Sequence, residues 1–189
     1  MYSCTSNVLT LLPAVASDTA FTLTASNPQL AAIDGKPVTA AGQHWVIGGT
    51  TQSYCPDQVN PNCPAGNITA VVSSGGSAAM DVEVPGGQLV YLDPFWNVGY
   101  TQAHSASIPS GSLTTGFGAY HGGGFVNLNG NGWGWVACPP TAAGGGGNDG
   151  SWNLVAKNDT NAANLGNCYG VNLKINELPQ GTDGAWQYT

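Results

Sequence analysis

The sequence predicts an all-β fold, an antiparallel sandwich or barrel, with a β-trefoil-like arrangement as the alternative. Its 28 glycines and 12 prolines leave almost no window that is long enough for an amphipathic helix. Short alternating or β-branched runs recur at intervals of roughly 8–15 residues, which is typical of sandwiches and barrels. Asp34–Gly35, Asn129–Gly130 and Asn131–Gly132 supply the positive φ angles of tight hairpin turns.

The expected strands follow these runs in chain order. They cover residues 20–25, 44–47, 68–73, 81–84, 88–92, 125–128, 133–137, 152–156 and 169–175. The apolar stretch 8–16 ends in Ala-Val-Ala, which resembles a signal-peptide cleavage site. No basic residue precedes it and Pro13 interrupts it, so we expect a first strand of the mature domain. Only residues 160–166 leave room for a helix, and we expect one domain over 1–189.

A faint internal repeat is the basis of the β-trefoil alternative. Residues 28–35, 87–94 and 124–130 each read as an apolar strand that ends in an Asp or Asn turn. Three copies would suit a threefold fold, although unrelated hairpins also resemble one another.

Charge excludes several classes of function. The chain has 10 acidic residues but only three basic ones, Lys36, Lys157 and Lys174, and no arginine. Nucleic acids, anionic lipids and phosphoryl groups need clusters of basic side chains, so none of these partners is expected. No apolar stretch is long enough to span a membrane.

The cysteines point to an oxidising compartment. Cys4, Cys55, Cys63, Cys138 and Cys168 contain no CxxC pair and no histidine at zinc-ligand spacing. Several pairings into two disulfides are open, among them a small loop closed by Cys55 and Cys63. Asn67 and Asn158 each begin an N-glycosylation sequence. Together these features favour a secreted protein.

Carboxylates and histidines are the side chains here that could form a catalytic or metal site. Asp81 and Glu83 lie two residues apart, on one strand face, at a spacing that suits the carboxylate pair of a glycosidase. Solvated carboxylates explain both residues equally well, so they are weak candidates. His44, His104 and His121 follow no metal-binding spacing, and we expect neither a metal site nor a cofactor.

Aromatic residues give the strongest indication of a binding site. Trp96 and Tyr100 lie in one aromatic-rich segment, and Trp133 and Trp135 share one face of a strand. Exposed rings at this spacing stack on sugars, whereas buried rings would build the core of a polar chain. We expect most of the rings to be core, and a neutral ligand surface centred on Trp96 and Tyr100, to which Trp133 or Trp135 could add.

The C-terminal half resembles fungal cell-wall proteins of the PhiA type, which are also described as IgE-binding or allergen-like. The resemblance rests on Ala137–Pro139, Gly150–Ala156 and Asn167–Val171. It implies a small secreted, wall-associated glycoprotein without an established enzymatic activity, and a bridge between Cys138 and Cys168. The chain ends without the late cysteine expected in this family. Cys4 is then free or intermolecular, which would allow an oligomer.

These observations lead to one functional hypothesis and two alternatives. The first is a non-enzymatic secreted or wall-associated protein that binds neutral polysaccharide. The second is a secreted glycosidase-like hydrolase of acidic media that uses Glu83 and an aspartate. The third is a purely structural wall protein.

Overall fold

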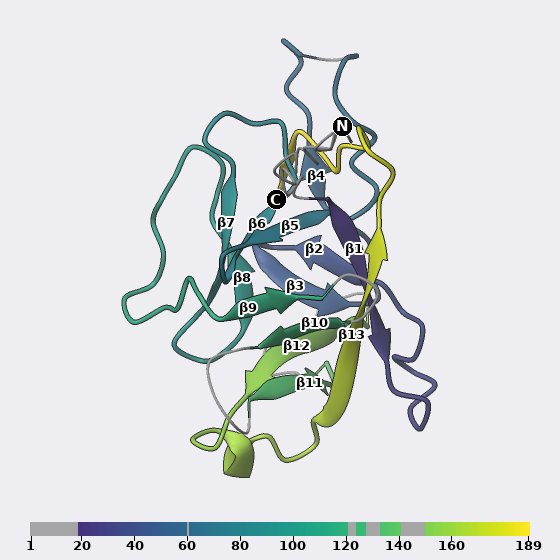
Figure 1. Cartoon of the computed structure of the whole chain (residues 1–189), viewed down its shortest axis with the longest axis vertical. Coiled ribbons are helices and arrows are strands. Elements are labelled where there is room, and N and C mark those ends of the chain that lie inside the picture. The colour runs from purple at the N-terminus through teal and green to yellow at the C-terminus, as the bar shows by residue number, and fades with distance from the viewer. Residues whose placement is uncertain (1–18, 60, 121–123, 128–132, 141–149) are drawn as a thin grey trace, which may run out of the picture.

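The computed structural model describes residues 19–59, 61–120, 124–127, 133–140 and 150–189. These residues form β-strands and one single-turn 3₁₀ helix, η1 (Ala162–Asn164), with no α-helix in the described ranges (Figure 1). The strands are β1 (Phe21–Ser26), β2 (Val38–Ala41), β3 (His44–Ile47), β4 (Ser53–Tyr54), β5 (Val71–Ser74), β6 (Ser77–Met80), β7 (Gln88–Leu92), β8 (Val98–Tyr100), β9 (Phe117–Ala119), β10 (Gly124–Asn127), β11 (Gly134–Cys138), β12 (Trp152–Lys157), β13 (Tyr169–Glu177) and β14 (Gln187–Tyr188).

Most strands belong to one antiparallel sheet that folds into two layers. Its order is β1-β5-β6-β7-β8-β3-β12-β11-β13-β10-β9, with β2 beside β3, while β4 and β14 form a separate pair. Strand β13 joins the layers, since residues 169–171 pair with β11 and residues 172–177 pair with β1. The predicted all-β fold is confirmed, and it is sandwich-like rather than a closed barrel.

Phe125 lies at the centre of an aromatic core. Its ring stacks on those of Phe117 and Trp135, at centroid distances of 5.9 and 5.8 Å, and also contacts Phe21 and Trp45. All five side chains are almost completely buried. A chain with few large aliphatic residues thus builds its core from rings, which bury the most apolar surface per residue.

The last residues of the chain pack in the core and are bound there by Gln88 of β7. Tyr188 is 1% exposed, and its hydroxyl donates to the Ile68 carbonyl at 2.8 Å and accepts from the Ala70 N–H at 2.9 Å. The side-chain amide of Gln88 binds both the N–H and the carbonyl of Tyr188. Gln88 therefore replaces a strand partner at this position.

The observed strands confirm most of the predicted runs and correct others. Residues 44–47 and 88–92 are strands with the predicted bounds. Residues 81–84 form no strand, because only Val82 makes an isolated bridge, to Ala185. The repeat fails at residues 28–35, which form turns rather than a strand. The predicted strand 8–16 and the two Asn-Gly turns lie outside the described residues.

Candidate functional site

Two of the four predicted ligand-binding aromatic residues belong to the core. Tyr100 has no exposed surface, and its hydroxyl donates to the Thr189 carbonyl at 2.9 Å. Burial raises the pKa of that hydroxyl. Trp135 is 6% exposed, and its indole N–H donates to the Phe125 carbonyl at 2.9 Å. The predicted surface is therefore corrected to exclude Tyr100, whereas Trp135 packs its ring in the core and also lines the cavity described below.

The other two, Trp96 and Trp133, are half-buried and contact each other. Their rings meet edge to face, with centroids 5.0 Å apart and planes at 84°. The Asp93 carboxylate fixes the turn that contains Trp96, because it accepts hydrogen bonds from the backbone N–H groups of Phe95 and Asn97 at 2.8 and 2.9 Å. Within this turn Trp96 has a φ of 70°, which bulky residues rarely adopt. The turn thus holds the Trp96 ring against Trp133 in spite of a strained backbone.

A cavity of about 760 Å³ opens beside Trp133. Its walls come from β11, the end of β12, the η1 turn and the first part of β13, at the end of the molecule away from β4 (Figure 1). We call this cavity the β11 groove, and its lining includes Trp133, Gly134, Trp135, Lys157, Gly166, Gly170 and Asn172. Its volume is in the range of sites that hold small molecules or short oligomers.

Three glycines line the β11 groove where the backbone does not require glycine. Gly134, Gly166 and Gly170 all lie outside the left-handed region, and an added Cβ would meet no atom within 4 Å. By contrast, Gly75 and Gly76 in the β5–β6 turn have φ angles of 59° and 84°. Neither backbone geometry nor packing explains the three groove glycines. Their missing side chains keep the groove open and allow a bound molecule to approach the backbone closely.

The lining of the β11 groove is nearly neutral. Among the described lining residues only Lys157 is charged, and no carboxylate is present. Asn172 on β13 is exposed and offers both an amide donor and a carbonyl acceptor. The groove therefore combines two tryptophans, glycines without side chains and neutral polar groups.

Asp81 and Glu83 do not line the same cavity. Half-buried Asp81 follows β6 and lines a cavity of about 380 Å³ together with Asp183, whereas Glu83 is exposed and absent from that lining. Burial, and then the nearby Asp183 carboxylate, raise the pKa of Asp81, while the Gly184 N–H opposes this shift. The carboxylate that is coupled to Asp81 is thus Asp183, and a catalytic role for Asp81 or Glu83 stays a prediction.

The histidines do not form a cluster in the described structure. His44 and His104 are exposed, and His121 lies outside the described residues. Within the described ranges, no group of three His, Cys, Asp or Glu side chains is placed to hold a metal ion. No helix there is both long and apolar enough to cross a membrane.

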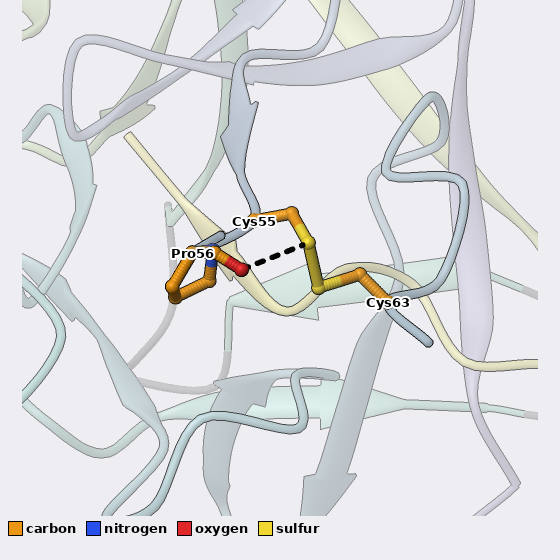
Figure 2. Close-up of a disulfide and its surroundings, with 3 residues drawn as sticks. All are labelled: Cys55, Pro56 and Cys63. Carbon is orange, nitrogen blue, oxygen red and sulfur yellow. Dashed lines mark hydrogen bonds between the residues drawn. A yellow bond between two sulfur atoms is a disulfide. The ribbon is translucent and has the colours of Figure 1, made fainter. Parts of the chain in front are cut away.

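Both expected disulfides are present. Cys138 and Cys168 join the end of β11 to the start of β13, and Cys168 also lines the β11 groove. Cys55 and Cys63 close the loop after β4, where the Cys55 sulfur lies 3.7 Å from the Pro56 carbonyl oxygen (Figure 2). By loop length the two bridges stabilise the fold by roughly 3–4 and 2–3 kcal/mol, respectively. Cys4 lies outside the described residues.

The two glycosylation sequences have different surroundings. Asn67 is exposed in the connection between β4 and β5. Asn158 is 3% exposed, directly after β12, and its side-chain oxygen accepts hydrogen bonds from Thr160 and Asn161.

Two disulfides in a small β-sandwich are typical of secreted proteins, because disulfides persist in oxidising, extracellular surroundings. The comparisons with known proteins agree. A sequence model of PhiA-like secreted proteins matches residues 21–189. An "Uncharacterized secreted protein" of the fungus Arthroderma benhamiae is 37% identical over 179 residues, covering 88% of this chain and 85% of that protein. No solved structure matches. The chain therefore belongs to the PhiA-like secreted protein family.

Sequence reasoning missed the groove glycines and Asp183. Gly134 and Gly170 lie in predicted strands and not in turn dipeptides. A glycine inside a strand is the signal that could have pointed to a close backbone approach. Asp81 and Asp183 are far apart in the sequence. They become neighbours only because the chain returns to this region after β13, which no local pattern predicts.

Proposed function

We propose that this protein is a non-enzymatic, wall-associated secreted protein that binds a neutral polysaccharide in the β11 groove. The observation that carries this proposal is the set of three open glycines around one cavity. A strand position without a side chain is unfavourable for stability unless it serves a turn, a bulge or a close approach. Gly134 and Gly170 serve neither a positive φ nor tight packing, which leaves close approach by a ligand.

The charges of the groove favour a neutral ligand. A phosphorylated or sulfated polymer would need several cations, and Lys157 is the one cation among the described lining residues. A cationic ligand would need carboxylates, and the described lining contains none. A neutral polyhydroxylated chain fits the remaining groups, with hydroxyls hydrogen-bonded to Asn172 and C–H faces against aromatic surface.

The expected affinity for a single sugar unit is low. A stacking contact with an indole contributes about 1 kcal/mol, by analogy with aromatic pairs. Trp133 alone would then hold a monosaccharide only weakly. A repetitive polymer raises the local concentration of equivalent units, and this converts weak contacts into useful retention.

The test is retention on insoluble chitin, β-glucan and mannan at pH 5. We expect the parent protein to be retained on at least one polymer, equally at low and high salt, because no charges are neutralised on binding. Trp133→Ala should lose retention, whereas Trp186→Ala, a matched change at another half-buried tryptophan, should keep it. Trp96→Ala should weaken retention through the loss of its contact with Trp133.

Three outcomes would contradict the proposal. Absence of retention on every polymer would favour a purely structural wall protein. Retention that disappears in salt would indicate charge-based binding. Release of soluble sugars from any polymer would favour the hydrolase alternative, and loss of that release in Asp81→Asn would locate it.

A further inference from the structure

The side chain of Asn158 is occupied within the fold. Its Oδ1 accepts hydrogen bonds from the Thr160 N–H and hydroxyl at 2.8 and 2.6 Å and from the Asn161 N–H at 3.0 Å. Asn161 returns the interaction, because its own Oδ1 accepts from the Asn158 N–H at 2.8 Å. The Asn158–Thr160 sequence is therefore a closed turn that ends β12.

A glycan on Asn158 is incompatible with this turn. An N-linked sugar leaves from the side-chain nitrogen and must reach solvent, but only 3% of Asn158 is exposed. Turning the amide outward would remove the acceptor of three hydrogen bonds and unmake the turn before η1. The residue types that form the acceptor sequence here serve the backbone instead.

Asn67 has the opposite surroundings. Its side chain is exposed. Thr69, the third residue of its sequence, is 4% exposed, and its hydroxyl accepts from the Ala40 N–H at 2.8 Å and lies 2.9 Å from the Thr51 hydroxyl. A transferase that reads the Thr69 hydroxyl must therefore act before this region folds, and the product then leaves the Asn67 side chain in solvent.

We propose that the folded, secreted protein carries an N-linked glycan at Asn67 and none at Asn158, because a chain modified at Asn158 before folding could not close this turn. The donor is a lipid-linked oligosaccharide diphosphate. A C–N bond forms between the anomeric carbon and the side-chain nitrogen of Asn67 as the bond from that carbon to the diphosphate oxygen breaks. The lipid diphosphate is the leaving group, and the amide nitrogen loses one proton. The connection between β4 and β5 lies at the end of the molecule opposite η1, so the glycan leaves the β11 groove open (Figure 1).

The test is site mapping on the full chain secreted from a yeast host. Enzymatic release of N-glycans in ¹⁸O-labelled water converts each occupied asparagine to labelled aspartate, which peptide mass spectrometry locates. We expect label at Asn67 and none at Asn158. The Asn67→Gln protein should show no mass change on glycan release. Thr160→Val destroys the second acceptor sequence but keeps Asn158, and it should show the same mass change as the parent.

Label at Asn158 in the secreted protein, or an unlabelled Asn67, would overturn the proposal. A reduced mass change in Thr160→Val would also overturn it. Thr160 is exposed, and Thr160→Val removes only its hydroxyl hydrogen bond while both backbone N–H donors to Asn158 remain, so we expect this variant to disturb the turn less than a change at Asn158 itself.

Discussion

Replacing Gln88 with leucine removes three hydrogen bonds from the protein interior. Gln88 is 1% exposed. Its amide nitrogen donates to the carbonyls of Thr101 and Tyr188 at 2.8 and 3.0 Å, and its oxygen accepts from the Tyr188 N–H at 2.7 Å. Leucine is of similar size, so the site stays filled, but three backbone groups lose their partner.

The cost follows from those unpaired groups. Leaving a buried donor or acceptor unsatisfied costs about 1–3 kcal/mol. The three groups share one side chain and are not additive, so we expect a loss of about 3–5 kcal/mol in the free energy of unfolding. Total stabilities are about 5–15 kcal/mol, so this change alone removes a large part. The melting temperature should fall by about 10 °C for a chain of this size.

The assay is urea unfolding of the parent, Gln88→Leu and Gln29→Leu, followed by circular dichroism. Gln29 is exposed in the turn after β1, and its replacement should change the unfolding free energy by less than about 0.5 kcal/mol. The denaturant dependence should stay the same, because the surface exposed on unfolding is unchanged. If Gln88→Leu unfolds at the same urea concentration as Gln29→Leu, then Gln88 does not anchor the last residues to β7.

Two further predictions concern the cavity of Asp81. Burial and Asp183 raise the pKa of Asp81, so the folded protein binds this proton more tightly than the unfolded chain, and the contribution of Asp81 to stability falls as pH rises above the ordinary value of 3.8. Asp81→Asn should therefore raise the melting temperature relative to the parent more at pH 7 than at pH 3; an equal difference at both values would show that Asp81 is not perturbed. In Gly184→Ala the added Cβ would lie 2.7 Å from both the Ala70 Cβ and the Asp81 carbonyl oxygen, so we expect a loss of about 1–3 kcal/mol. Gly170→Ala is the matched control, and its melting temperature should equal that of the parent. Equal melting temperatures of the two variants would contradict the tight packing at Gly184.

The sequence predicted strands well where apolar residues alternate or gather. Strands β3 and β7 have the predicted bounds because their residues have strong strand preferences of their own. Strands β6 and β9 were missed, since Ser, Ala and Gly carry little signal and become strands only through their partners. The strand predicted at 81–84 was wrong for the complementary reason. Its valines favour a strand, but only Val82 forms a β-bridge with another segment.

The candidate site was harder to predict, because it depends on burial. Composition shows that some aromatic residues must fill the core, but not that Tyr100 would be enclosed while Trp133 and Trp135 line a cavity. An Asn-x-Thr sequence likewise contains no information on whether its asparagine is enclosed. From sequence, a glycine that serves a turn cannot be told from one that keeps a groove open. The φ angles and the empty space around Gly134 and Gly170 distinguish these two from the turn glycines.

The most direct test of the central claim is to fill the β11 groove without disturbing the sheet. Gly170→Val puts a residue with a high strand preference on β13 at a position where an added Cβ meets no atom within 4 Å. Ser74→Val on β5 is the matched control at an exposed strand position outside the groove. On a polymer that retains the parent, we predict that Ser74→Val binds like the parent and that Gly170→Val, with an unchanged melting temperature, binds at least about tenfold more weakly, a loss of about 1.4 kcal/mol. Equal binding of folded Gly170→Val and Ser74→Val would show that the β11 groove is not the polysaccharide site.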